Sequence, residues 1–268
     1  MDAFLQRVVP DELWELFQRV VPSAPTRPQG GGRRRVDDRM ILAAIVYVAT
    51  TGCAWRQLPP VFGASWQTVN RRFAEWSAAR VWAKLYRIIL DELGARGELD
   101  WSRCAIDSVS VRAMKGGKLT GPNPVDRGKP GSKIHLITER TGLPISVAIS
   151  AANTHDSQEL QPLVRGIPPI RSPRGPRRRR PAKLHGDKGY DYPHLRTFLR
   201  SRRIAPRIAR RGIESSQRLG RHRWVVERTV SWLAGCRRLH RRYERRADHF
   251  ASFVAIAAAL ICYRRLTK

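Results

Sequence analysis

Residues 104–111 read Cys-Ala-Ile-Asp-Ser-Val-Ser-Val, and this short apolar run with one carboxylate inside it decides the fold class. Its small and β-branched residues predict a buried strand. Further strands are predicted at 133–139, 143–150, 182–185 and 204–209, and helices at 156–165, 192–202, 222–239 and 247–265. Three strands in series, followed by alternating helix and strand, predict an α/β fold with a mixed sheet flanked by helices.

The chain before this strand shows helical periodicity only. A helix is predicted after Pro10, with Asp11 as its cap and Pro22 as its stop, and residues 38–94 are again helical. Residues 22–35 hold Pro, Gly and Arg and almost nothing to bury, which predicts a flexible basic linker. We therefore expect an all-helical N-terminal region at 1–95 and a second domain at 100–268.

One predicted helix in the N-terminal region has the pattern of a DNA reader. Ser65 can cap it, and its apolar stripe is Trp66, Val69, Phe73 and Trp76. Gln67, Asn70 and Arg71 face the other way, and these side chains can pair with adenine and guanine in the major groove. A helix-turn-helix and a plain helical bundle with a solvated polar face are equally compatible with this pattern.

The overall composition points to a polyanionic partner. The 268 residues include 51 Lys and Arg against 22 Asp and Glu, which gives a formal net charge of +29. Such a charge repels itself unless a partner neutralises it, and 42% hydrophobic residues exclude a wholly disordered tail. The four Cys are scattered and suggest neither disulfides nor a zinc site. The N-terminus does not resemble a signal peptide, and the apolar stretch 250–263 is too short to span a bilayer, so we expect a cytoplasmic protein.

The acids are more informative than the bases. Residues 201–268 contain 18 Lys and Arg but only four acids. Asp107 interrupts a strand predicted to be buried, Asp187 follows a short strand, and Glu227 lies in a mostly apolar helix. Burying a carboxylate is costly unless it is paired or bound to metal. Three such oxygen ligands suit two Mg²⁺ or Mn²⁺ ions, the arrangement used for phosphoryl transfer.

Each acid also has a purely structural interpretation. Asp107 could cap a turn, Asp187 could form an Asx-turn beside Gly189, and Glu227 could pair with Arg223 one helical turn earlier. Taken together, in a chain so poor in acids, the three favour a nuclease-like triad.

At these residues the sequence resembles bacterial transposases of the insertion-sequence-five type, within the DDE superfamily. The matching stretches run in order along the chain: 105–108, 115–133, 152–157, 186–191, 208–212, 223–233 and 242–246. The resemblance implies a ribonuclease-H-like catalytic domain at 100–268, with Asp107, Asp187 and Glu227 as catalytic and metal-binding residues. The short interval between Asp187 and Glu227 implies that no large β-domain is inserted there.

The resemblance also implies the activity and its partners. We expect a DNA transposase that binds the terminal inverted repeats of its element, cleaves the ends with two Mg²⁺ or Mn²⁺ ions and joins the 3′-OH to target DNA. A homo-oligomer in a synaptic complex, associated with the bacterial nucleoid, is expected on the same basis.

The match departs from the family pattern at two positions beside Glu227. Arg223 stands where the family carries an Arg, but Gly220 replaces a Tyr and Ala234 replaces a basic residue. Arg237 and Arg238, one predicted helical turn further along, are candidates for the missing basic partner.

The basic residues expected to contact DNA fall in several clusters outside the predicted recognition helix. They are Arg33, Arg34, Arg35, Lys133, Arg177, Arg178, Arg179, Arg180, Arg223, Arg237 and Arg238. Further arginines up to Arg246 extend the last cluster.

Two other functional classes remain open from the sequence. A covalent recombinase could use Tyr243, which follows His240 and two arginines. A non-catalytic DNA-binding regulator would use the helical N-terminal region alone and would leave the three acids unexplained. The pair His155 and Asp156 could lie near the metals, or Asp156 or Ser157 could instead cap the helix that follows.

Overall fold

The N-terminal part of the chain is helical, as the sequence predicts. The computed structural model describes residues 2–24, 35–210, 212 and 216–267, with the side chains of Asp2 and 216–223 outside the described part. The helices of this region are α1 (Asp2–Val8), α2 (Asp11–Gln18), α3 (Asp38–Thr51), α4 (Trp66–Ala78) and α5 (Val81–Ala95). Most of the predicted linker, including Arg33 and Arg34, lies outside the described residues.

Helix α4 begins where its cap predicts. The Ser65 hydroxyl accepts a hydrogen bond from the Thr68 N–H at 3.3 Å, and Val69, Phe73 and Trp76 are buried. The connection from α3 spans residues 52–65 and contains two 3₁₀ turns, so it is longer than the turn of a compact helix-turn-helix. The tight connection is the next one, where Ala79 and Arg80 alone separate α4 from α5.

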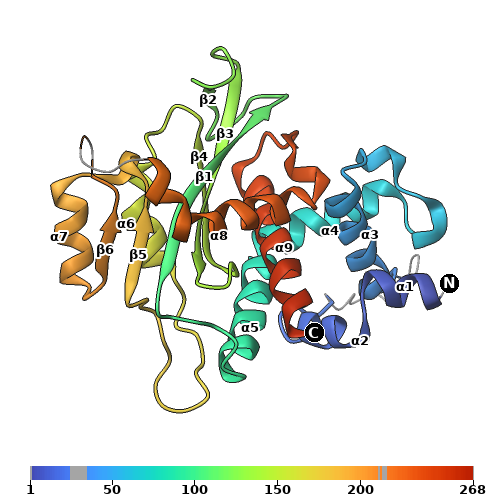
Figure 1. Ribbon diagram of the computed structural model, residues 1–268. Coiled ribbons are helices and arrows are strands. Elements are labelled where there is room, and N and C mark those ends of the chain that lie inside the picture. Colours follow the sequence, from blue (N-terminus) through green and yellow to red (C-terminus); the bar gives the residue numbers. More distant parts are fainter. Residues whose placement is uncertain (1, 25–34, 211, 213–215, 268) are drawn as a thin grey trace.

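A mixed sheet forms the second half of the molecule (Figure 1). Its main strands are β1 (Cys104–Ala113), β3 (Pro130–Glu139), β4 (Pro144–Ala151), β5 (Lys183–Gly186) and β6 (Ala205–Ile208), with short additions β2 (Gly121–Pro122) and β7 (Arg241–Arg242). Strand β3 pairs antiparallel with β1 and β4, while β5 pairs parallel with β1 and β6. The resulting order, β4-β3-β1-β5-β6, is that of a ribonuclease-H-like sheet and confirms the predicted fold class.

Helices cover both faces of the sheet. Helix α6 (Ser157–Gly166) packs on β3 and β4, where the Ser146 hydroxyl donates to the Leu163 carbonyl at 2.8 Å. Helix α8 (Ser216–Ala234) packs against β1, β3 and β5 and crosses in front of β1 in Figure 1. Helix α7 (Pro193–Ser201) lies beside β6 at the edge of the sheet.

The last helix, α9 (Ala247–Leu266), joins the two halves. It packs against α5 on one side and against β4 and α8 on others, so residues from Val9 to Tyr263 share one continuous core. The helix has 20 residues, whereas the apolar stretch noted in the sequence has 14. By length and composition, this helix could cross a membrane. The helix is nevertheless mostly buried inside the protein, and apolar residues occur all around it, as expected of a core helix.

Several predicted boundaries change. Helix α1 has no counterpart in the prediction, and Pro10 rather than Asp11 precedes α2 as its cap. The helix predicted at 222–239 begins earlier and ends at Ala234, after which Arg237–Leu239 form a separate 3₁₀ turn. Arg237 and Arg238 are therefore not on a further turn of α8. All four cysteines are free thiols, in agreement with their scattered positions.

Candidate active site

Asp107 and Asp187 occupy matching positions on two neighbouring strands. In the parallel pair β1 and β5, Ala105 lies opposite His185, and each aspartate follows its member of that pair by two residues. Asp187 comes directly after β5 with extended backbone angles, φ −79° and ψ −177°. Because parallel strands lie about 4.8 Å apart, the two carboxylates project side by side from one face of the sheet.

Backbone N–H groups orient both carboxylates. Asp107 Oδ1 accepts a hydrogen bond from the Ser108 N–H at 2.8 Å, and Asp187 Oδ1 accepts one from the Gly189 N–H at 2.9 Å. The second bond is the Asx-turn considered from the sequence. It fixes the side chain without neutralising its charge, so the turn is compatible with a role in the site. Both aspartates are half-buried.

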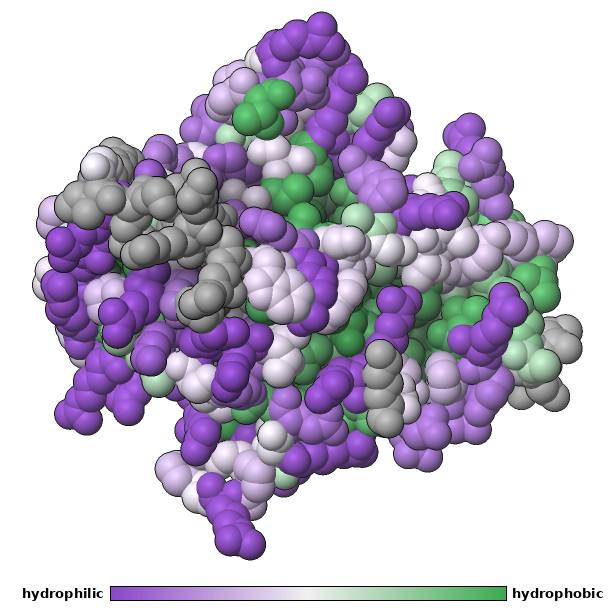
Figure 2. All heavy atoms as spheres, viewed as in Figure 1, coloured by the Kyte–Doolittle hydropathy of each residue, from purple (hydrophilic) through white to green (hydrophobic). Residues whose placement is uncertain are grey.

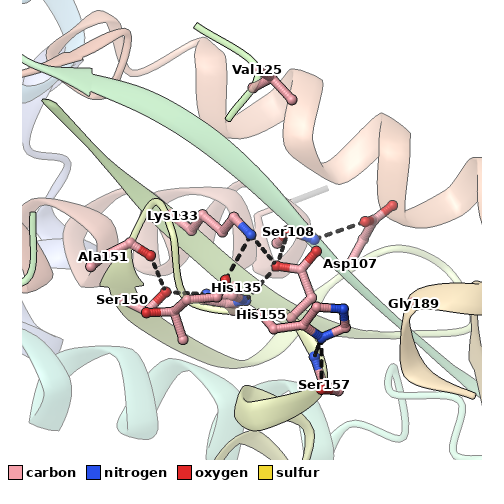
Figure 3. Close-up of polar contacts among 12 residues, drawn as sticks. Asp107, Ser108, Val125, Lys133, His135, Ser150, Ala151, His155, Ser157 and Gly189 are labelled. Carbon is pink, nitrogen blue, oxygen red and sulfur yellow. Dashed lines mark hydrogen bonds and ion pairs between the residues drawn. The ribbon is translucent and has the colours of Figure 1, made fainter. Parts of the chain in front are cut away.

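The opposite face of β1 carries a separate polar cluster. Asp156 Oδ1 accepts hydrogen bonds from the Ser108 hydroxyl at 3.0 Å and from Lys133 Nζ at 2.9 Å, and Asp107 points away from this cluster (Figure 3). Asp156 precedes α6 without capping it, whereas the His155 ring caps it by accepting from the Ser157 N–H at 3.3 Å. The pair 155–156 thus has a structural role at the start of α6.

Burial keeps one histidine of this cluster neutral. His135 is fully buried, and its Nε2 lies 2.7 Å from the Ser150 hydroxyl. Burial lowers the pKa of His135 to about 4, outweighing the nearby Asp156 carboxylate, which raises it. At neutral pH the imidazole is therefore uncharged and works as a hydrogen-bonding core residue.

Glu227 is exposed, which corrects the prediction of a buried acid. Helix α8 buries a stripe that includes Val225, Val226 and Thr229, and Glu227 falls outside that stripe. The window looked apolar on all sides because it contains Trp224 and Trp232, yet both indoles are surface residues, 49% and 36% exposed. The Arg223 side chain, its proposed ion-pair partner, lies outside the described residues.

The three acids suit a divalent cation in their chemistry, since carboxylate oxygens are the ligands that Mg²⁺ and Mn²⁺ prefer. Two of these acids, Asp107 and Asp187, lie at the same level of the neighbouring strands β1 and β5. Among the described residues, however, no three acidic, His or Cys side chains lie together closely enough to hold a metal ion. Glu227, the third predicted ligand, lies on α8, the helix that packs against β1 and β5.

Comparisons with known proteins identify the family of this chain. Residues 101–262 match the family model described as transposase DDE domain, and residues 9–86 match the one described as putative transposase of IS4/5 family. The chain is 46% identical over 149 residues to a putative transposase for insertion sequence element IS402 from Burkholderia cepacia, covering 56% of this chain and 71% of that protein.

The chain belongs to the DDE transposase family.

Two further similarities are weaker. An uncharacterized 16.2 kDa protein of insertion element IS402, also from Burkholderia cepacia, is 40% identical over 119 residues, covering 44% of this chain and 81% of that protein. A crystal structure of the Mos1 mariner paired end complex with Mn aligns over 100% of this chain and 92% of that chain, at 11% identity and a TM-score of 0.32. The fold assignment therefore rests on the strand order.

In this DDE transposase, the predicted base readers lie on the outer side of α4. Gln67 and Arg71 are exposed and Asn70 is half-buried. Arg71 lies 3.7 Å from Glu75 one turn further along, a surface pair that solvent weakens. The three side chains are accessible on one helix face, and base reading by them stays a prediction.

Arg238 is a buried structural residue, which corrects its prediction as a DNA contact. Its side chain is 6% exposed and donates from Nε and Nη2 to Glu244 Oε1 at 2.9 and 2.7 Å. Nη1 donates to the Cys53 carbonyl at 3.0 Å. The guanidinium is thus enclosed by protein, whereas its neighbour Arg237 is exposed.

Arg242 is a second buried arginine, which corrects its prediction as part of the last DNA-contacting cluster. It is fully buried and donates to the carbonyls of Lys118, Leu119 and Glu244 and to the Ser132 hydroxyl. The stretch 242–246, quoted for its resemblance, therefore fastens the loop after β1 to the C-terminal segment. The isolated acid Glu244, flanked by arginines, was the available sequence signal of an ion pair in this stretch, and its carboxylate pairs with Arg238.

The remaining basic candidates divide into paired and exposed ones. Lys133 is 14% exposed and also donates to the Thr154 carbonyl, so its ammonium already has two partners inside the protein. Arg35 pairs with Asp38 at 3.2 Å. Arg177, Arg178, Arg179 and Arg180 are exposed on the loop before β5.

The structure does not favour a tyrosine nucleophile. The Tyr243 ring, 38% exposed, lies against the guanidinium of Arg238 at 5.2 Å, and that arginine is held by Glu244. His240 Nε2 lies 2.7 Å from the Ala234 carbonyl. Arg238, Arg242 and His240, which a recombinase would aim at a phosphate, have partners within this segment or the loop after β1 instead.

Proposed function

We propose that this protein is a metal-dependent DNA transposase that cleaves the ends of its element and joins them to target DNA. The observation that carries the proposal is the register of β1 and β5, which places Asp107 and Asp187 each two residues after the paired positions Ala105 and His185, within the matched DDE domain and beneath the helix that bears Glu227. A regulator that only binds DNA has no need of this arrangement.

Asp107, Asp187 and Glu227 would hold two Mg²⁺ or Mn²⁺ ions. When bound, such ions stabilise the entering and leaving oxygens of an in-line phosphoryl transfer. The chain's own contribution is to fix two carboxylates on rigid strands and to orient them through the Ser108 and Gly189 N–H groups. At a scissile phosphate placed there, water would be the nucleophile and the 3′-OH of the element's end the leaving group. That 3′-OH would then attack a phosphate of the target strand and displace the 3′ oxygen of the target.

Completion of the site requires Glu227 to turn toward the strands. Its side chain now lies on the exposed side of α8, and a long carboxylate on a helix can change rotamer without disturbing the buried stripe. We infer that entry of metal and DNA brings Glu227 and the neighbouring Arg223 to the reacting phosphate. The proposed role of Arg223 is phosphate contact or orientation of Glu227.

DNA binding divides between the two proposed parts of the chain. Residues 1–95 would recognise the terminal inverted repeats through Gln67, Asn70 and Arg71 on α4, and residues 100–268 would carry out the chemistry. Arg33, Arg34, Arg35 and Arg237 are proposed to contact phosphates. A homo-oligomer on paired ends, working in the cytoplasm on the nucleoid, completes the proposal.

Cleavage of the element's own ends tests the proposal. The purified full chain is incubated with labelled fragments from each side of its gene, with Mg²⁺, Mn²⁺ or EDTA. Nicks at the boundaries of flanking inverted repeats, dependent on the metal, are expected. Sequence-specific binding without cleavage in either metal would support the regulator instead, and a covalent protein–DNA adduct would support the recombinase.

A further inference from the structure

A basic groove lies at the edge of the sheet where β1 and β5 begin. Its volume is about 1000 Å³. One wall is formed by Gly97 and residues 99–102, and the other by residues 177–180 and Ala182, with Arg203 from the turn before β6. Five of the lining residues are arginines. Asp100, the one acid among these lining residues, already pairs with Arg140 at 3.1 Å.

Alternate arginines fasten the groove's outer wall to the protein. Arg177 Nη1 donates to both carboxylate oxygens of Asp91, at 2.8 and 2.9 Å, and Arg179 donates to the carbonyls of Ile167 and Arg165. Arg178 exchanges two backbone hydrogen bonds with Ile170, at 2.8 and 2.7 Å.

A glycine on α5 permits the loop to lie against that helix. A Cβ at Gly94 would stand 2.2 Å from the Arg171 carbonyl oxygen, so only glycine allows this close approach. The loop hangs below the sheet beside the end of α5 in Figure 1, and the same region is mainly hydrophilic in Figure 2.

The other arginines of the groove have no acidic partner among the residues that the structure describes. Because side chains alternate along an extended segment, fixing Arg177 and Arg179 inward turns Arg178 and Arg180 outward. Both are exposed, as is Arg203, and within the described chain none of the three makes an ion pair. Three unpaired guanidinium groups on a held scaffold form a site for phosphate groups.

The groove and the two aspartates lie at different places along the strands. Trp101 precedes Asp107 by six residues and Ala182 precedes Asp187 by five. At about 3.3 Å per residue, roughly 16–20 Å separate the groove from the carboxylates. A phosphate that reacts at Asp107 and Asp187 therefore cannot also lie in the groove.

We propose that this groove binds the sugar-phosphate backbone of a second DNA duplex while the first is held at the aspartates. The inference rests on the proposed transposase function, because joining an element to its target brings two duplexes to one protein. Arg178, Arg180 and Arg203 are the phosphate contacts, and Arg177 and Arg179 hold the wall that presents them.

The test uses the full chain and two sets of charge-matched variants. The groove variant is Arg178→Ala, Arg180→Ala and Arg203→Asn, where asparagine suits the positive φ of 56° at that position. The control removes three other exposed cations without a described ion pair, as Arg7→Ala, Lys84→Ala and Arg87→Ala. Thermal unfolding of both should match wild type, because none of the six side chains belongs to the core.

The first readout is the salt dependence of binding to a labelled duplex of unrelated sequence. The logarithm of the binding constant falls with the logarithm of the salt concentration, and each lost phosphate contact makes this slope shallower by about 0.9. The slope of the groove variant should therefore be shallower than that of wild type by about 2 to 3. The control should lose less than about 1. A wild-type slope in the groove variant, or an equal loss in the control, overturns the proposal.

The second readout separates this proposal from the catalytic one. The protein is first saturated with an unlabelled duplex of the element's end, and a second, labelled duplex is then added. No metal is present, and binding of the labelled duplex to the complex is measured by gel shift. Wild type and the Asp107→Ala, Asp187→Ala double variant should capture it, while the groove variant should lose at least tenfold in affinity. Equal capture by the groove variant, or groove-dependent capture of duplex RNA alone, refutes the second DNA site. Neither result depends on whether the protein cleaves DNA.

Discussion

The buried pair Arg238 and Glu244 offers the sharpest test of how the C-terminal segment is built. Both side chains are 6% exposed, and two N–H groups of the arginine converge on Glu244 Oε1 at 2.9 and 2.7 Å. Replacing Arg238 with Met leaves the carboxylate buried and uncompensated. Breaking such a pair costs about 3–5 kcal/mol, since the remaining charge has lost its partner in a poorly polarisable surrounding.

A double variant distinguishes a lost pair from lost packing. Arg238→Met with Glu244→Leu removes both charges and keeps apolar volume against the rings of Trp55 and Phe253, which lie 5.9 and 5.3 Å from the guanidinium. The double variant should recover most of the stability, because well-packed apolar residues commonly replace a buried ion pair at little cost.

Urea unfolding at pH 7 measures these differences. The exposed neighbour supplies the control, since Arg237→Met should change the unfolding free energy by less than about 0.5 kcal/mol. A cost below about 1 kcal/mol for Arg238→Met, or a double variant as unstable as the single one, would refute the reasoning. In that case Arg238 would again be a candidate for DNA contact.

The remaining predictions concern acid stability, backbone space and base reading. The pKa of His135 in the folded protein is about 4, against its usual 6.5, so the unfolded chain binds more protons between these two values. The free energy of unfolding therefore falls by about 3 kcal/mol as the pH drops through this window. His135→Asn should remove this part of the acid sensitivity of the urea midpoint, and an unchanged pH profile would contradict the prediction. Gly117→Ala places a Cβ 2.2 Å from the Arg245 carbonyl oxygen at a φ of +117°. It should lower the melting temperature far more than Gly116→Ala, whose Cβ meets nothing within 4 Å. Equal shifts in melting temperature would show that the loop is not packed as described. Asn70→Ala should reduce the preference for the element's ends over unrelated DNA by about 1–3 kcal/mol while leaving non-specific affinity intact, and a uniform loss of affinity would argue against base reading.

The order of strands and helices could be predicted because it follows from local patterns. The alternating runs of β1, β3 and β4, the turn at 140–142 and the cap at Ser65 are each encoded within a few residues. The placement of Asp107 within one strand and of Asp187 directly after another also followed from the sequence, whereas their shared role in one site stays a prediction.

The roles of the arginines could not be predicted in the same way. Arg242 is buried by contacts with Lys118, Leu119 and Ser132, more than 100 residues earlier in the chain. The charge of a side chain is visible in the sequence, but the elements that will enclose it are not. The same holds within the run 177–180, where neighbouring arginines have opposite roles because one end of the loop is tied to α5.

Glu227 shows the limit of reading burial from composition. Trp224 and Trp232 suggest a buried helix, yet they stand on the surface with the Arg228 guanidinium between them, 4.5 and 4.7 Å from their rings. An aromatic ring that stacks on an arginine guanidinium can remain at the surface, because the cation–π interaction stabilises it there. The apolar residues of a helix therefore do not by themselves define its buried face.

Metal-dependent cleavage of the element's ends by three carboxamide variants tests the central claim most directly. Asp107→Asn, Asp187→Asn and Glu227→Gln keep the shape of each side chain and remove its charge, while Asp37→Asn and Glu15→Gln are exposed controls. With Mg²⁺ or Mn²⁺, wild type and both controls should nick the end, and each of the three variants should lose at least a thousandfold in rate while retaining its affinity for the DNA. Cleavage at the wild-type rate by any one of the three would remove that residue from the site, and cleavage by all three would contradict the DDE mechanism.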